Sequence, residues 1–140
     1  MARLVITSLL VAITLTGCHD SNSHCYEDIF GNTKPGSLKI LACDGGEFRD
    51  VGHYYVRFYC NNSDMHRLFN SGFRVISPRE FIQDMGSTEG PTPSWWKPVV
   101  TKTAVCLHST SFHKDFQSGA TYLTYDHASN IGEMYWEGSD

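Results

Sequence analysis

Short runs of apolar and aromatic residues, each of strand length, recur along most of this chain. Residues 51–60 form the strongest run, because tyrosine, valine and phenylalanine favour a pleated, half-buried strand. Residues 37–43 are apolar enough for a second, partly buried strand. The segment between the two runs begins with Asp44-Gly45-Gly46, which is a turn signal. The two runs therefore predict an antiparallel hairpin that turns within residues 44–50.

The C-terminal third of the chain shows further strand patterns. Apolar residues alternate with threonine, lysine and alanine over residues 99–107, which predicts a strand. Residues 122–125 and 133–136 are rich in aromatic side chains and predict a final hairpin that turns through residues 126–132. Together with the first hairpin, these segments predict an antiparallel sheet of about four to six strands.

Two segments between the strands carry helix signals. Residues 63–70 begin with a serine that can cap a helix, and they end before Gly72. Residues 77–80 (SPRE) have the capping-box pattern with proline at the first helical position, and Gly86 ends this helix. Residues 86–98 contain three prolines and two glycines and predict a loop. The pattern as a whole indicates an α+β domain with a small antiparallel sheet and one or two short helices.

The first eighteen residues combine a positive charge, an apolar stretch and small residues before a cysteine. Arg3 precedes the apolar residues 4–15, and Thr16 and Gly17 stand directly before Cys18. This order describes a secretory signal peptide. A membrane-spanning helix is the alternative, but it needs about 20 apolar residues. A buried core helix would not explain the small residues in front of the cysteine.

Residues 15–18 (LTGC) resemble the cleavage and lipidation box of the bacterial lipoprotein class. The resemblance implies that residues 1–17 are a signal peptide and that Cys18 receives a lipid and becomes the mature N-terminus. The polar residues 18–24 then form a short lipidated tether, and residues 25–140 form a single globular domain. We expect a protein that faces the periplasm and is anchored to a membrane of the cell envelope.

The net charge of the chain bears on its possible partners, and the residue after the lipidated cysteine bears on which membrane holds it. The chain has 11 basic and 15 acidic residues and a formal net charge of −4. Nucleic-acid binders normally carry a basic patch, so we expect no nucleic-acid partner and a membrane contact made by the lipid alone. His19 follows Cys18, in place of the aspartate that tends to hold lipoproteins at the inner membrane. The outer membrane is therefore favoured over the inner membrane.

Besides Cys18 the chain has four cysteines, which are Cys25, Cys43, Cys60 and Cys106. An even number in an oxidising compartment predicts two disulfides, whereas a zinc site would call for C-x-x-C pairs that the sequence lacks. The predicted hairpin separates Cys43 from Cys60 by more than the roughly 7 Å that bridged Cα atoms allow. Two pairings stay open: Cys25–Cys43 with Cys60–Cys106, or Cys25–Cys60 with Cys43–Cys106.

Adjacent tryptophans, Trp95 and Trp96, lie in the proline-rich loop. Tryptophan buries a large rigid area and dominates many interfaces, so this pair predicts a platform for an envelope protein or a glycan. Tyr135 and Trp136 are the next candidates for partner contact. The alternative is that one indole fills the core while the other lies along the surface. The function expected from these features is a small, membrane-anchored binding or accessory module.

Catalytic and metal-binding signals are weak. The sequence has no G-x-S-x-G nucleophile motif and no glycine-rich phosphate loop, so we expect no catalytic residues and no cofactor, and a non-enzymatic role is favoured. Seven histidines are scattered without H-E-x-x-H spacing, which favours surface histidines without a metal. The runner-up function is a periplasmic enzyme or metal-binding protein that uses C-terminal side chains, namely His108, His113, Asp115, Asp126 and His127.

Two short motifs add a third possibility. Residues 118–122 (SGATY) and 135–138 (YWEG) resemble the paired motifs of membrane-bound c-type lysozyme inhibitors. Members of that family are small periplasmic lipoproteins that insert such loops into the lysozyme cleft, so the resemblance implies lysozyme inhibition as an alternative function. The chain departs from the family pattern in two respects. Glu137 stands where the second motif carries lysine, and no closing strand and cysteine follow it.

Overall fold

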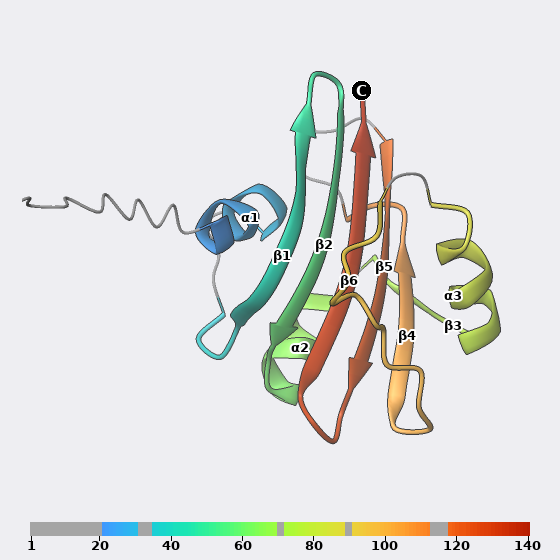
Figure 1. Cartoon of the computed structure of the whole chain (residues 1–140). Helices are drawn as coiled ribbons and strands as arrows, with labels where there is room; N and C mark the ends of the chain where they lie inside the picture. The colour runs from blue at the N-terminus through green and yellow to red at the C-terminus, as the bar shows by residue number, and fades with distance from the viewer. Residues whose placement is uncertain (1–20, 31–34, 70–71, 89–90, 113–117) are drawn as a thin grey trace, which may run out of the picture.

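The computed structural model describes residues 21–30, 35–69, 72–88, 91–112 and 118–140. Within these ranges the chain forms one six-stranded antiparallel sheet, in the strand order β1-β2-β6-β5-β4-β3, and three short helices (Figure 1). The strands are β1 (Lys39–Phe48), β2 (Val51–Tyr59), β3 (Arg74–Ile76), β4 (Ala104–Ser109), β5 (Ser118–Asp126) and β6 (Ile131–Ser139). The helices are α1 (Ser21–Phe30), α2 (Asn62–Phe69) and α3 (Pro78–Met85). The expected antiparallel sheet is confirmed, and the described part of the fold is mostly sheet.

One face of the sheet, the core face, packs against α1 and α2. Strand alternation directs every second side chain of the central strands to this face, where they are excluded from solvent. The strand residues in this cluster include Val56, Phe58, Leu123, Met134 and Trp136. The helices contribute Cys25, Ile29, Met65 and Phe69 to the same cluster. Neither helix is long enough to persist alone, so this burial is what holds α1 and α2 in place.

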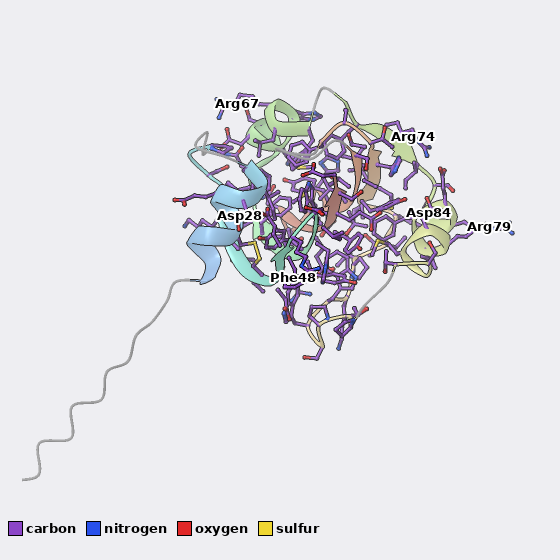
Figure 2. All side chains as sticks on the ribbon, turned by 90° about the horizontal axis from the view of Figure 1, so that it is seen from above. Asp28, Phe48, Arg67, Arg74, Arg79 and Asp84 are labelled. Atoms are coloured by element: carbon purple, nitrogen blue, oxygen red, sulfur yellow. A yellow bond between two sulfur atoms is a disulfide. The ribbon has the colours of Figure 1, made fainter. Side chains whose placement is uncertain are left out.

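The opposite face, the polar face, carries charged and aromatic side chains from the same strands. Its members include Tyr55, Arg57, Tyr122, Glu133 and Tyr135. Seen from above, α3 lies across the sheet from α1, with Arg79 and Asp84 marking α3 and Asp28 marking α1 (Figure 2). The chain between α3 and β4 crosses the front of the sheet in Figure 1. The polar face is therefore covered by one helix and one irregular segment, and only in part.

Local sequence signals explain both predicted helices. In α3, the side chain of Ser77 accepts a hydrogen bond from the backbone N–H of Glu80, as the capping box predicts. The predicted helix over residues 63–70 is α2, which begins one residue earlier. Asn61 caps it by accepting a hydrogen bond of 2.8 Å from the backbone N–H of Asp64, so the cap is an asparagine and not the expected Ser63.

The predicted first hairpin is confirmed, and it turns at the end of the predicted segment 44–50 and not at the Asp44-Gly45-Gly46 signal. Residues 44–46 belong to β1, and the turn is Arg49-Asp50 with Arg49 in the left-handed region at φ 56°. The glycines serve a close strand contact instead of a turn. Gly45 has φ 132°, and a Cβ atom there would lie 2.1 Å from the carbonyl oxygen of His53. Glycine is needed at this position because no side chain fits between the paired strands.

Other boundaries also differ from the prediction. The strand expected over residues 99–107 begins at Ala104, because Ala104 donates to the carbonyl of Thr101 in a turn. Residues 21–24, which belong to the expected tether, are helical in α1. The signal peptide and Cys18 lie outside the described residues. None of the helices within the described ranges has the length and apolar character that crossing a membrane demands.

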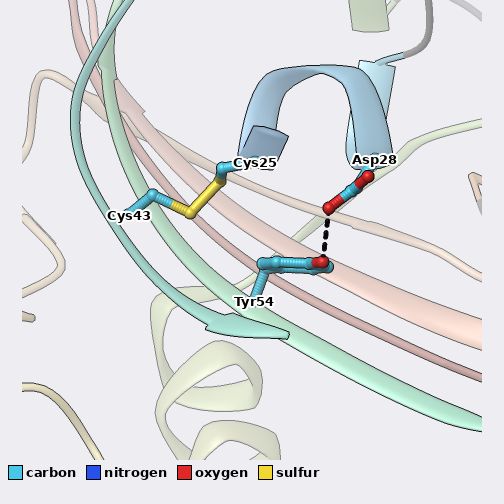
Figure 3. The surroundings of a disulfide bond; sticks show 4 residues. All are labelled: Cys25, Asp28, Cys43 and Tyr54. Carbon is cyan, nitrogen blue, oxygen red and sulfur yellow. Dashed lines mark hydrogen bonds between the residues drawn. A yellow bond between two sulfur atoms is a disulfide. The ribbon is translucent and has the colours of Figure 1, made fainter. Parts of the chain in front are cut away.

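One of the two expected disulfides is present. Cys25 of α1 is bonded to Cys43 of β1, with Cα atoms 6.5 Å apart (Figure 3). Beside this bond, the hydroxyl of Tyr54 donates a 2.7 Å hydrogen bond to Asp28 of α1. The prediction of a second disulfide is wrong, because Cys60 and Cys106 are free and buried. They cannot meet, because Cys60 belongs to the core-face cluster and Cys106 packs with Ile76 and Phe81 on the polar face.

Candidate ligand-binding site

A row of tyrosines crosses the polar face. The strand register aligns Tyr55 of β2 with Tyr135 of β6, and Tyr135 with Tyr122 of β5. His108 of β4 continues the row beyond Tyr122, and their rings lie 4.6 Å apart. The rings of Tyr55 and Tyr135 lie 4.9 Å apart. Four neighbouring strands thus place aromatic side chains at paired positions on one face of the sheet, and we call this row the aromatic band.

The loop with the two tryptophans covers one end of this band. The Trp96 ring lies 5.1 Å from that of Tyr55, and Arg57 donates a 2.9 Å hydrogen bond to the backbone carbonyl of Trp95. The guanidinium of Arg57 also lies 5.7 Å from the centre of the Trp95 ring. Both tryptophans are half-buried, which leaves part of each ring accessible. Their predicted contact with a partner stays a prediction.

A buried ion pair anchors this covered region. Arg57 donates from Nε to Oε1 of Glu133 over 2.6 Å, and Glu133 is only 1% exposed. Burial raises the pKa of the Glu133 carboxyl, while Arg57 and the backbone N–H of Lys97 act in the opposite direction. Among the described residues, two buried atoms here, the Tyr55 hydroxyl and Oε2 of Glu133, find no hydrogen-bond partner. The ion pair joins β2, β6 and the loop, so we assign it a structural role.

The uncovered part of the polar face contains a pocket of about 500 Å³, which we call the tyrosine pocket. Tyr122 and Tyr135 from the aromatic band line it, together with Glu137 of β6. Asp84 at the end of α3 lines it from outside the sheet. The remaining lining residues are Val51, Gly52, His53, Ser87 and Thr88. Three strands and one helix end therefore converge on this site.

The pocket is acidic and rich in hydrogen-bond donors. The hydroxyl of Tyr135 donates a 2.8 Å hydrogen bond to Oε2 of Glu137. Burial raises the pKa of Tyr135, and the bond to Glu137 raises it further. Burial also raises the pKa of Tyr122, and the negative charges of Asp84 and Glu137 add to that effect. Both phenols therefore stay protonated at neutral pH, beside two carboxylates.

A second hollow lies next to the tyrosine pocket, at the tip of the β1–β2 hairpin. This tip hollow has a volume of about 640 Å³ and shares Val51 and His53 with the pocket. Phe48 lines it and is 76% exposed, while Val51 is 56% exposed. The guanidinium of Arg49 lies 5.3 Å from the centre of the Phe48 ring. The tip thus offers exposed apolar surface beside the acidic pocket.

The two C-terminal aromatic residues predicted to contact a partner have different positions. Tyr135 forms part of the pocket floor, although it is 2% exposed. Trp136 points to the core face, is fully buried and donates a 3.1 Å hydrogen bond to the carbonyl of Phe112. Trp136 is therefore a core residue, and its predicted partner contact is wrong. The alternation of a strand explains this result, since neighbouring residues face opposite sides.

The C-terminal histidines and carboxylates take up separate positions. His127 is hydrogen-bonded through Nδ1 to Asn62, and Asp126 accepts hydrogen bonds from Ser129 and Thr103. His108 packs on Tyr122, and burial lowers its pKa. Residues 113 and 115, the other two predicted ligands, lie outside the described residues. Within the described residues no group of three or more metal-ligating side chains comes together.

Comparison of the chain with protein-family models, with curated proteins and with solved structures finds no match. The two motifs that resemble those of lysozyme inhibitors do come together in the fold. Residues 118–122 pair with residues 135–139 along β5 and β6, so that Gly119 lies opposite Gly138 and Tyr122 opposite Tyr135. Tyr122, Tyr135 and Glu137 from these motifs line the tyrosine pocket.

Proposed function

We propose that this protein is a lipid-anchored lipoprotein of the cell envelope, facing the periplasm, that acts as a small binding module. The observation that carries the binding role is the tyrosine pocket. Its volume of about 500 Å³ lies within the roughly 300–1,000 Å³ typical of ligand sites. Most of its polar side chains stand on paired strands, so binding would order few groups that are free beforehand.

The proposed compartment is supported by sequence and by covalent chemistry. The lipidation box ends at Cys18, and a disulfide such as Cys25–Cys43 is typical of proteins outside the cytoplasm. Each buried methylene of an acyl chain contributes about 0.8 kcal/mol to membrane residence. We place the module at the outer membrane in preference to the inner membrane, because His19 follows the lipidated cysteine.

Site-specific photo-crosslinking in the native envelope tests the binding role. A photoreactive amino acid at Val51 reports on the pocket and the tip hollow together, because Val51 lines both. The same amino acid at Val75 is the matched control, since Val75 is 72% exposed on β3, at the other edge of the sheet. Capture of a defined partner at position 51 but not at position 75 supports the proposal. No capture, or equal capture at both positions, contradicts it.

Lysozyme inhibition is a second candidate, and one observation favours it. The two motif segments lie side by side in register, and together they supply both tyrosines and one carboxylate of the pocket. The measurement is lysis of bacterial cells by c-type lysozyme with and without the purified full chain. Slower lysis that is restored by the Tyr122→Ala variant supports inhibition, and unchanged lysis at excess protein rules it out.

A further inference from the structure

We infer that the tyrosine pocket binds the cationic side chain of a lysine or arginine, carried by a basic and partly apolar segment of a partner protein. This inference rests on the proposed binding function and names the chemistry of its partner. Three properties of the site carry it: uncompensated negative charge, two tyrosine rings that line the pocket, and apolar surface at its rim.

The negative charge of the pocket is not balanced by its own lining. Asp84 and Glu137 lie close enough to Tyr122 that both raise the pKa of its hydroxyl. Among the described residues that line the pocket none is a lysine or an arginine. Arg74, the nearby cation on β3, is paired with Glu80 over 2.8 Å. A positive group entering the pocket would therefore meet two carboxylates that lack a cationic partner in its wall.

The end of α3 adds to this negative potential. The carbonyl end of a helix carries a partial negative charge, which favours cations and disfavours carboxylates. Asp84 lies in the last turn of α3, and this turn contains no basic residue. The C-terminus of α3 therefore combines the partial negative charge of its carbonyl groups with the negative charge of the Asp84 carboxylate. A bound ammonium or guanidinium group would relieve this unfavourable arrangement.

The tyrosine rings explain why the ligand is a side chain with a cationic head and not a metal ion. Tyr122 and Tyr135 remain neutral phenols. The ring of Tyr122 is partly exposed and can contact a cation, and both hydroxyls can hydrogen-bond. Within the described residues, no three metal-ligating groups converge at this site. An organic cation satisfies both the rings and the carboxylates, whereas a metal ion would find too few ligands.

The neighbouring hairpin tip explains why the segment is also apolar. Phe48 and Val51 are exposed at the rim, and Val51 belongs to both hollows. Among the described residues that line the tip hollow, Glu47 and Asp50 are acidic and Arg49 is basic. A segment that alternates apolar and basic residues therefore matches the whole surface, with its cation in the pocket and its apolar neighbour against Phe48.

A matched pair of peptides tests the inference. One probe alternates leucine with arginine, and the other replaces each arginine by citrulline, which keeps the shape and removes the charge. Binding to the full chain in detergent micelles is measured by isothermal titration calorimetry. We expect the arginine peptide to bind at least roughly tenfold more tightly than its citrulline counterpart, since each factor of ten in affinity requires about 1.4 kcal/mol. Equal affinity overturns the inference.

Variants connect this binding to the pocket. Glu137→Gln and Asp84→Asn keep the size of each side chain and should together weaken binding of the arginine peptide by roughly tenfold or more. Glu27→Gln on α1 is the control, because it removes the same charge from a side chain on the other side of the sheet. Asp84→Asn should not lower the melting temperature, because it removes a negative charge from the end of a helix. Loss of affinity without loss of stability separates a ligand contact from unfolding.

The outcome also distinguishes this inference from the proposed function. If photo-crosslinking at Val51 captures a partner but the arginine peptide binds no better than the citrulline peptide, the binding module stands and the cationic ligand is wrong. If an oligosaccharide binds and the Glu137→Gln variant loses it, the pocket is a glycan site and the inference is overturned. If neither peptide binds and position 51 captures nothing, both proposals fail.

Discussion

Replacing Arg57 by alanine tests how the covered part of the polar face is held together. Glu133 is 1% exposed and Arg57 is its ion-pair partner, so this variant leaves a buried carboxylate without its cation. It also removes the donor to the carbonyl of Trp95. Breaking a buried pair from one side costs about 3–5 kcal/mol. Because the Arg57 side chain is itself 32% exposed, we expect the lower end of that range, about 3 kcal/mol.

A double variant tests whether the unpaired Glu133 carboxylate causes this destabilisation. A double variant, Arg57→Met with Glu133→Leu, removes both charges and should be at least roughly as stable as the natural protein, because no buried charge is left unpaired. Urea unfolding followed by tryptophan fluorescence measures both variants, since Trp95 lies against Arg57. If the double variant is as unstable as Arg57→Ala, the unpaired Glu133 carboxylate is not the cause of the destabilisation.

The pH dependence of the Arg57→Ala variant follows from the Glu133 carboxyl. Burial already raises the pKa of this group above its value in the unfolded chain, so the folded state holds its proton more tightly. A group of this kind stabilises the fold below the unfolded pKa, and that contribution is lost as the pH rises through the folded pKa. The destabilisation by Arg57→Ala should therefore be full at neutral pH and shrink in acid. A cost that does not change with pH contradicts this account.

Three further predictions concern other parts of the chain. Cys18→Ala should abolish labelling by radioactive palmitate and release the protein from membranes, whereas continued sedimentation with membranes argues against a lipid anchor. Reducing Cys25–Cys43, which are separated by 18 residues in sequence, should lower the free energy of unfolding by about 3 kcal/mol in urea with dithiothreitol; an unchanged midpoint argues against the bond. Burial raises the pKa of Tyr125 from 10.0 to about 12, so the unfolded chain releases this proton first. Stability should fall as the pH rises between these values, and less steeply in Tyr125→Phe; equal slopes would exclude this source of alkaline instability.

The sequence predicts those features that short segments decide by themselves. The side chain of Ser77 accepts a hydrogen bond from the backbone N–H of Glu80, so the start of α3 is decided within four residues. The aromatic residues of β5 and β6 predict their hairpin in the same way. Gly45 is different, because the contact that requires a glycine there involves the carbonyl of His53 on another strand. A glycine pair in a sequence does not show whether it serves a turn or a close strand contact.

Most of the candidate site could not be predicted from the sequence, because the pairing register of the strands brings its residues together. The aromatic pattern predicted partner contact for Tyr135 and Trp136 alike. Only the alternation of side chains along β6 shows that Tyr135 lines the pocket and that Trp136 lies in the core. Glu137 and Asp84 come from β6 and α3, which no spacing in the sequence relates. The pairing of β6 with both β2 and β5 had to be known before His53, Tyr122 and Glu137 could be placed together.

The position of β6 in the sheet also has a consequence for how the chain is made. β6 is the last described strand in the sequence, yet it lies between β2 and β5 and pairs with each along its whole length. β2 is synthesised roughly 80 residues before its partner β6, as the pairing of Val56 with Met134 illustrates. Until β6 arrives, the strands on either side of it have open edges and cannot form one sheet. The complete sheet therefore cannot form until β6 has been synthesised.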